Sequence, residues 1–127
     1  MAKKMIFDAL MSTEKGGLTV HLSLYSFIED KVTIIYCPAL DISGYGLDEE
    51  EARKSFETIF SETIDYMMKK NTFHDDLKAH GWHIRGKKSN DLKAPSFADL
   101  YKKNEDFKNI IDNKEYHKFD KNVVIPA

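Results

Sequence analysis

The chain has 127 residues, of which 42% are hydrophobic and 31% charged, and its net charge is −2. This composition is typical of one globular domain, and it excludes collagen-like, disordered and disulfide-scaffold proteins. The single cysteine, Cys37, excludes an intrachain disulfide and favours a reducing cytoplasm. No apolar run approaches the ~20 residues of a membrane span, so neither a membrane segment nor a secretory signal is expected.

Three strands are predicted after residues 1–17, whose apolar pattern is too short to interpret. From Leu18 to Phe27 apolar and polar residues alternate with a period of two, which is typical of a half-buried strand. Residues 32–37 are β-branched and aromatic and predict a second strand that ends before Pro38. Residues 41–46 predict a third, short strand, and its two glycines indicate a bulge or a close backbone approach.

A long helix is predicted from Glu49 to Lys69. Asp48 is a natural N-cap residue, and Glu51 stands three residues later, as a capping box requires. An apolar stripe at helical spacing then follows, wide enough to cover a small sheet. The stripe comprises Ala52, Phe56, Ile59, Phe60, Thr63, Ile64, Met67 and Met68.

A short helix and a fourth strand are predicted next. Thr72 is placed to cap this helix, and Gly81 is placed to stop it. Residues 82–85 alternate and predict a strand. Because it follows a helical crossover, this strand is expected to run parallel to one of the earlier strands.

The remaining residues predict a linker and a C-terminal extension. Residues 87–95 are polar and are interpreted as a linker between a domain at 1–86, with its core at about 18–86, and an extension at 96–127. The stripe over 97–111 predicts one helix of about 15 residues or two short helices broken at Asn104. Residues 123–125 are apolar and β-branched, and we expect them to dock on this chain's sheet or on a partner's. The predicted fold is α+β, with a three- to four-stranded, mostly antiparallel sheet packed on one long helix.

Residues 18–85 resemble the HicB-type antitoxin family. The resemblance lies in a strand that ends in the turn Cys37-Pro38-Ala39-Leu40, a third strand containing glycine, and an aspartate-capped helix that begins Glu49-Glu50-Glu51-Ala52. Gly81-Trp82 followed by an alternating strand also fits the end of that module. The resemblance implies a partial ribonuclease-H-like fold and a non-catalytic protein that sequesters a small, basic, HicA-like ribonuclease toxin. It also implies an oligomer that binds its own promoter DNA, although a helix followed by a strand after residue 95 does not match a ribbon-helix-helix segment.

The residues themselves give little indication of catalysis. Two-metal phosphodiester chemistry requires converging carboxylates, and the strand at 18–27 contains none. His80 and His83 have a spacing that could hold zinc on one helix, but Gly81 is expected to end the helix between them. Cys37 is expected to be a packed, apolar residue rather than a nucleophile. No catalytic residue, metal or cofactor is therefore predicted.

Charge suggests candidate contact residues for two kinds of partner. Residues 1–84 carry 9 basic and 14 acidic side chains, whereas residues 85–127 carry 10 basic and 7 acidic ones. The acidic part suits a basic toxin, with candidates Asp41, Tyr45, Asp48, Glu49, Glu50 and Glu51, although the last four also cap a helix. Weaker candidates for DNA phosphates are Lys87, Lys88, Lys102, Lys103 and Lys108.

The C-terminal residues Val123, Val124 and Ile125 are candidates for pairing between subunits of a homodimer. A non-catalytic oligomeric scaffold and an orphan DNA-binding regulator with the same fold are the alternatives to the antitoxin. A neighbouring gene for a short basic protein would distinguish the antitoxin from both.

Overall fold

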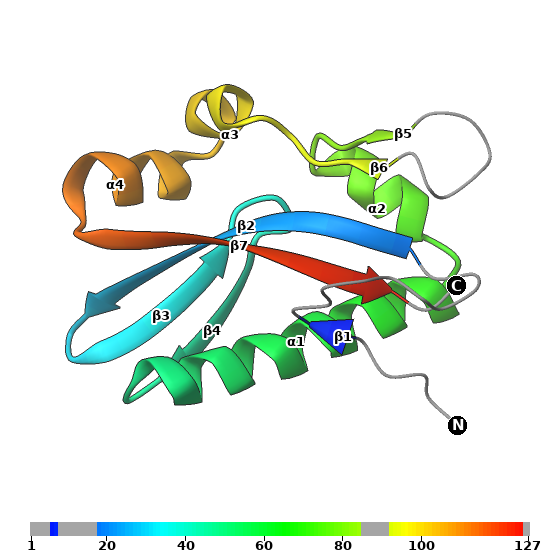
Figure 1. Cartoon of the computed structure of the whole chain (residues 1–127). Helices are drawn as coiled ribbons and strands as arrows, with labels where there is room; N and C mark the ends of the chain where they lie inside the picture. Colours follow the sequence, from blue (N-terminus) through cyan, green and yellow to red (C-terminus); the bar gives the residue numbers. More distant parts are fainter. Residues whose placement is uncertain (1–5, 8–17, 85–91, 126–127) are drawn as a thin grey trace.

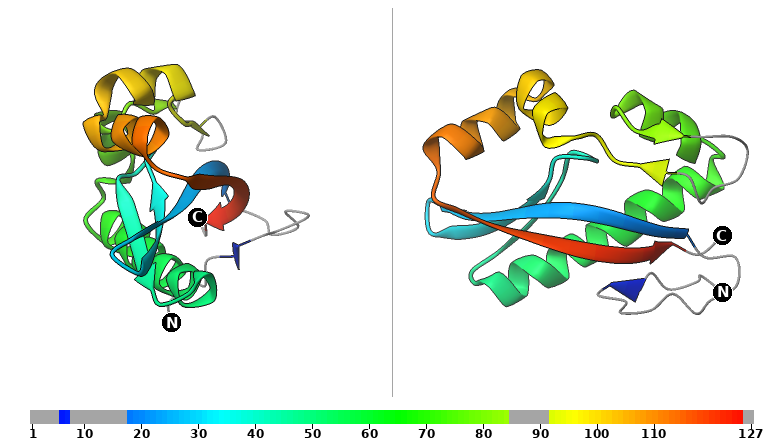
Figure 2. Two further views of the ribbon diagram at one scale, coloured as in Figure 1. Left: turned by 90° about the vertical axis from the view of Figure 1, so that its left-hand side faces the viewer. Right: turned by 45° about the horizontal axis from the view of Figure 1, so that its top comes forward.

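The fold is α+β, as the sequence predicts. The computed structural model describes residues 6–7, 18–84 and 92–125. Its main sheet has the strand order β1-β7-β2-β3-β4, and every neighbouring pair is antiparallel. Helices lie on both faces of this sheet: α1 packs on one, and α4 packs on the other (Figures 1 and 2). We refer to these as the α1 face and the α4 face.

A tight hairpin joins the first two long strands, β2 (Leu18–Glu29) and β3 (Val32–Cys37). Glu29 pairs with Val32, so only Asp30 and Lys31 form the turn. Both turn residues have positive φ, 50° and 68°, which is the conformation of a type I′ turn and matches the twist of antiparallel strands. β3 then pairs with the edge strand β4 (Ile42–Gly46).

Helix α1 (Glu49–Lys69) begins and ends where the sequence predicts. The Asp48 side chain accepts a hydrogen bond from the Glu51 N–H at 2.8 Å, which confirms the predicted N-cap. The residues that α1 buries are Ala52, Phe56, Phe60, Ile64 and Met67. The helix backbone lies directly on Gly44 and Gly46 of β4, because a Cβ atom at either position would overlap α1 backbone atoms. The predicted close approach at these glycines is confirmed.

The predicted fourth strand does not join the main sheet. Helix α2 (Phe73–Ala79) ends before Gly81, whose φ of +89° stops it, as expected. β5 (His83–Ile84) then pairs antiparallel with β6 (Leu92–Lys93) in a separate two-stranded sheet. The expectation of a parallel crossover strand is therefore wrong, because β5 pairs with the chain that follows it. Most of the predicted linker falls at residues 85–91, outside the described residues.

The C-terminal extension covers the second face of the sheet. Asn104 separates α3 (Phe97–Lys103) from α4 (Glu105–Asn113), which confirms the two-helix alternative. Phe107 and Ile110 of α4 pack against Tyr25, Phe27 and Tyr36 on the α4 face. In the second part of β2, Tyr25 and Phe27 are buried under α4, in addition to the side chains on the α1 face. β2 is therefore half-buried only in its first part.

The last strand, β7 (Tyr116–Ile125), lies inside the sheet order rather than in a separate unit. It pairs with β2 along its length, from Phe27↔Tyr116 to Leu18↔Ile125. On its other side the short β1 (Ile6–Phe7) pairs with Val124 and Val123. The terminal strand thus docks on this chain's own sheet, one of the two outcomes that the sequence left open.

Candidate functional site: a groove between the sheet and helix α4

The α4 face is only partly covered by its helix. Helix α4 packs over β2 and β3 but leaves β4 open, and a groove of about 510 Å³ lies between them. We call it the β4–α4 groove. A row of paired residues, Phe27, Ile34 and Tyr45, crosses its floor from β2 to β4. Exposure rises along this row, since Phe27 is 7% exposed and Tyr45 55%. The groove therefore presents an aromatic side chain at its open margin.

A hydrogen-bonded network closes one end of the groove. The buried Tyr36 hydroxyl donates to Asp41 Oδ1 at 2.7 Å and accepts from Asn104 Nδ2 at 2.8 Å. Asn104 Oδ1 also accepts from the Phe107 N–H at 3.0 Å and so caps α4. Burial, together with the hydrogen bond to Asp41, raises the pKa of Tyr36 well above its usual value. The hydroxyl therefore stays protonated and holds β3, β4 and α4 in a fixed relation.

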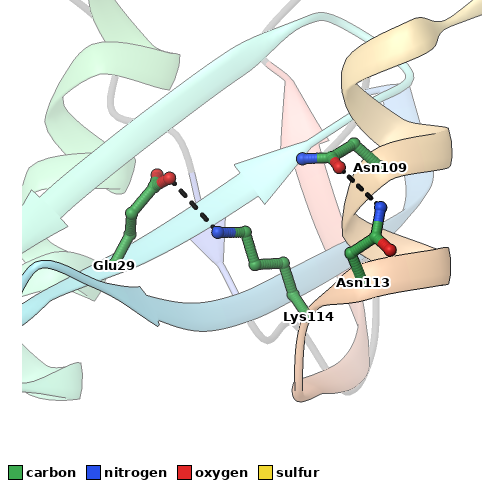
Figure 3. Close-up of polar contacts among 4 residues, drawn as sticks. All are labelled: Glu29, Asn109, Asn113 and Lys114. Atoms are coloured by element: carbon green, nitrogen blue, oxygen red, sulfur yellow. Dashed lines mark hydrogen bonds and ion pairs between the residues drawn. The ribbon is translucent and has the colours of Figure 1, made fainter.

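The opposite end of the groove is closed by an ion pair. Lys114, just after α4, lies 3.2 Å from Glu29 Oε1 at the end of β2 (Figure 3). On α4 itself, Asn113 donates to Asn109 Oδ1 at 2.7 Å (Figure 3). Because Lys114 is paired with Glu29, the other charged residues that line the groove, Asp41 and Asp106, give it a negative balance.

A second cavity of about 640 Å³ lies between the α2–β5 segment and the two C-terminal helices. It shares Asp41 and Asp106 with the β4–α4 groove, so the two hollows meet at these carboxylates. His80 and His83 line the second cavity. Within the described ranges, however, no three histidine, cysteine, aspartate or glutamate side chains are grouped as a metal site would require.

The structure separates the predicted toxin-binding residues into two groups. Asp41 and Tyr45 line the β4–α4 groove. Asp48 caps α1, and the exposed Glu49 and Glu50 form i,i+4 ion pairs with Arg53 and Lys54. The N–H of Glu51 binds the cap. This second group lies beyond the other end of β4 from Asp41, so the six candidates do not form one compact patch.

The predicted DNA-binding lysines do not form a uniform basic surface where they are described. Lys102 and Lys103 are exposed at the end of α3, and only Asn104 separates them from Glu105 and Asp106. Lys108 lies over the Tyr101 ring, 5.7 Å from its centroid. Lys87 and Lys88 fall outside the described residues.

The predicted oligomerisation residues are paired within the chain. Val123 is fully buried, and it lies between Val20 of β2 and Phe7 of β1. Val124 likewise pairs on both sides, and Ile125 pairs with Leu18. In this structure these residues complete the monomer's own sheet.

Cys37 is buried in the α1-face core, as expected. Burial raises the pKa of its thiol to about 12, so the thiol stays protonated at neutral pH and is a poor nucleophile. None of the helices in the described ranges has the length and apolar character needed to cross a membrane.

Sequence reasoning missed several residues of the groove. The sequence places Tyr36 in a strand and Asn104 at a helix break, but no local pattern indicates that they meet, or that Asp106 and Lys114 belong to the same groove. One of these residues can be found from the sequence: Asn104 lies between two helical stripes, and asparagine is a preferred N-cap residue of a following helix. Its second contact, with Tyr36, joins residues that are 68 positions apart and has no local signature.

The comparisons with known proteins give no relative from which a function can be transferred. No protein-family model matches the sequence, and no curated protein or solved structure is significantly similar to it.

Proposed function

We propose that this protein is a non-catalytic, HicB-like antitoxin that binds and sequesters a small, basic ribonuclease toxin in the cytoplasm. The observation that carries the proposal is the β4–α4 groove, which is lined by the exposed Tyr45 and by two carboxylates, Asp41 and Asp106. Aromatic residues at the margin of a hollow are typical protein-binding anchors, and carboxylates attract a basic partner. The resemblance of residues 18–85 to the HicB family supports the same partner class.

Local chemistry makes this groove suited to binding without rearrangement. The Tyr36–Asp41–Asn104 network fixes its floor and wall before any partner arrives, so little ordering is required on association. Asp41 adopts a positive φ of 55°, a conformation that aspartate and asparagine tolerate better than most residues. Asp41 is exposed, and a carboxylate can accept hydrogen bonds from a lysine or arginine of a partner.

The proposal is tested by growth rescue. A neighbouring open reading frame for a short basic protein is expressed alone, and then together with this chain. We expect arrest of growth by the first and relief by the second. Tyr45→Ala and the double variant Asp41→Asn/Asp106→Asn should weaken the relief and the affinity for the purified partner by about 10-fold or more. Asparagine keeps the backbone preference at position 41 and removes only the charge.

The control is Asp75→Asn, which makes the same kind of substitution at an exposed position on α2 and removes one negative charge. It should leave rescue unchanged. Arrest that this chain does not relieve would refute the antitoxin proposal. Relief that survives all the groove substitutions, with soluble protein of normal circular dichroism, would refute the groove as the contact.

A further inference from the structure

The second cavity, of about 640 Å³, lies between two walls of opposite charge. The titratable side chains that line it from the α2–β5 segment are all basic, namely Lys78, His80 and His83. Helices α3 and α4 contribute one lysine and three carboxylates, namely Lys103, Asp99, Glu105 and Asp106. Asp41, from the turn before β4, adds a fourth carboxylate. Figure 1 and the right-hand view of Figure 2 show the two segments standing apart, joined through β6.

The opposite charges do not pair with each other across this cavity. In the described part of the chain, no ion pair joins the two walls, and all these titratable side chains are exposed. The lining includes neither Ile84 nor Leu92, the two residues next to 85–91, which lie outside the described ranges. The charges of the two walls are therefore separated, and a ligand between them can contact both.

Apolar side chains form part of the same lining, namely those of Pro38, Trp82, Pro95 and Leu100. The indole of Trp82 is held in place, because it is buried and its Nε1 donates to the Ala39 carbonyl oxygen at 2.8 Å. A Cβ atom at Gly81 would lie 3.7 Å from Pro95 Cβ, so the turn after α2 is close to the residues that lead into α3. The cavity thus offers fixed apolar contacts as well as the two charged walls.

We propose that this cavity binds a zwitterionic group in which a short aliphatic chain joins a carboxylate to a guanidinium or ammonium group. Such a group is present in free arginine and in an arginine or lysine at the C-terminus of a peptide. The carboxylate binds the α2–β5 wall, where Lys78 and the two imidazoles can donate hydrogen bonds, and the cation binds the carboxylates of α3 and α4. The cavity has the volume of a typical small-molecule site, about 300–1,000 Å³. The proposal does not rest on the antitoxin function, because Lys78 and the histidines do not line the β4–α4 groove.

The test is a nuclear magnetic resonance titration of the full chain, followed at the indole N–H of Trp82, the only tryptophan. Nα-acetyl-L-arginine carries both charged groups and imitates the C-terminal residue of a peptide. It should shift this resonance with a Kd of about 1 mM or lower. Agmatine lacks the carboxylate and Nα-acetyl-L-citrulline lacks the cation, so each should bind at least about 10-fold more weakly. L-Arginine, compared with its acetylated form, distinguishes a site for the free amino acid from a site for a peptide end.

Lys78→Gln should weaken the binding of Nα-acetyl-L-arginine by about 10-fold and leave that of agmatine unchanged, because only the first ligand has a carboxylate. Unchanged agmatine binding also shows that this variant is folded. The matched control, Lys118→Gln, makes the same substitution at an exposed position on β7 outside the cavity, and should bind as the wild type does. An indole resonance that does not move with Nα-acetyl-L-arginine up to about 20 mM overturns the proposal. Equal binding of agmatine or of the citrulline derivative, or wild-type affinity in Lys78→Gln, also overturns it.

Discussion

Gly44 lies where helix α1 touches the edge strand, and Gly44→Ala is expected to force the two apart. A Cβ atom there would lie 2.6 Å from Phe56 Cα and 2.7 Å from the Ala52 carbonyl oxygen, and it would also overlap the Phe56 backbone nitrogen. These are backbone atoms, so no change of rotamer relieves the overlap. An ordinary contact begins near 3.4 Å. Helix α1 must therefore withdraw by at least about 0.8 Å.

The cost of this withdrawal follows from what the helix buries. Overpacking a core costs about 1–3 kcal/mol, and more when backbone must move. Five buried side chains of α1 share the displacement, which places the cost near the upper end. The lower entropy of the unfolded alanine variant offsets about 0.4–1 kcal/mol. We therefore expect Gly44→Ala to lower the free energy of unfolding by about 2–3 kcal/mol.

The assay is urea unfolding, followed by far-ultraviolet circular dichroism and by the fluorescence of Trp82, the only tryptophan. Ser43→Ala is the matched control, because it alters the neighbouring residue on the opposite face of β4, and it should change stability by less than about 0.5 kcal/mol. A Gly44→Ala variant as stable as Ser43→Ala would refute the close packing of α1 on β4.

Three further predictions concern the α4 face and the core. Asn104→Ala removes both the cap of α4 and the hydrogen bond to Tyr36, so it should lower the free energy of unfolding by about 2 kcal/mol in urea titration. In the same titration, Asn109→Ala, at an exposed position of α4, should lower it by less than about 0.5 kcal/mol. Cys37 should react with a thiol reagent at pH 8 only as fast as the protein opens, so labelling that is fast in the absence of urea would contradict its burial. Burial, reinforced by nearby Tyr116 and Asp120, raises the pKa of Tyr25 from 10.0 to about 12. As the pH rises, the unfolded chain therefore loses this proton before the folded chain does, and the free energy of unfolding should fall between about pH 10 and pH 12. Tyr25→Phe should make that fall less steep in pH-dependent unfolding.

Local signals account for the parts of the fold that were predicted correctly. Asp48, Glu51 and the apolar stripe define α1 without reference to the rest of the chain, and Gly81 likewise defines the end of α2. Each of these elements is specified by residues within one or two turns of chain, so its bounds can be read from the sequence.

Prediction failed where an element's position depends on which distant strand or sheet face it packs against. The alternating residues 82–85 predict a strand, but their pattern does not indicate which other strand it pairs with. β5 was therefore assigned to the wrong sheet. The apolar residues Phe107 and Ile110 predict a buried helix face but not the face of the sheet that they cover. The groove depends on this docking, and only Asp41 and Tyr45 among its polar residues were therefore predicted.

The position of β7 between β1 and β2 also has a consequence for synthesis. The residue that pairs with Phe27 is Tyr116, which is translated 89 residues later. At roughly 5–20 residues per second, the ribosome needs about 4–18 s to reach it. During that interval the edge of β2 that β7 will occupy has no partner, and Tyr25 and Phe27 lack the α4 residues that cover them. The nascent chain is thus exposed to chaperones, and to pairing with other nascent chains, until its last strand has emerged.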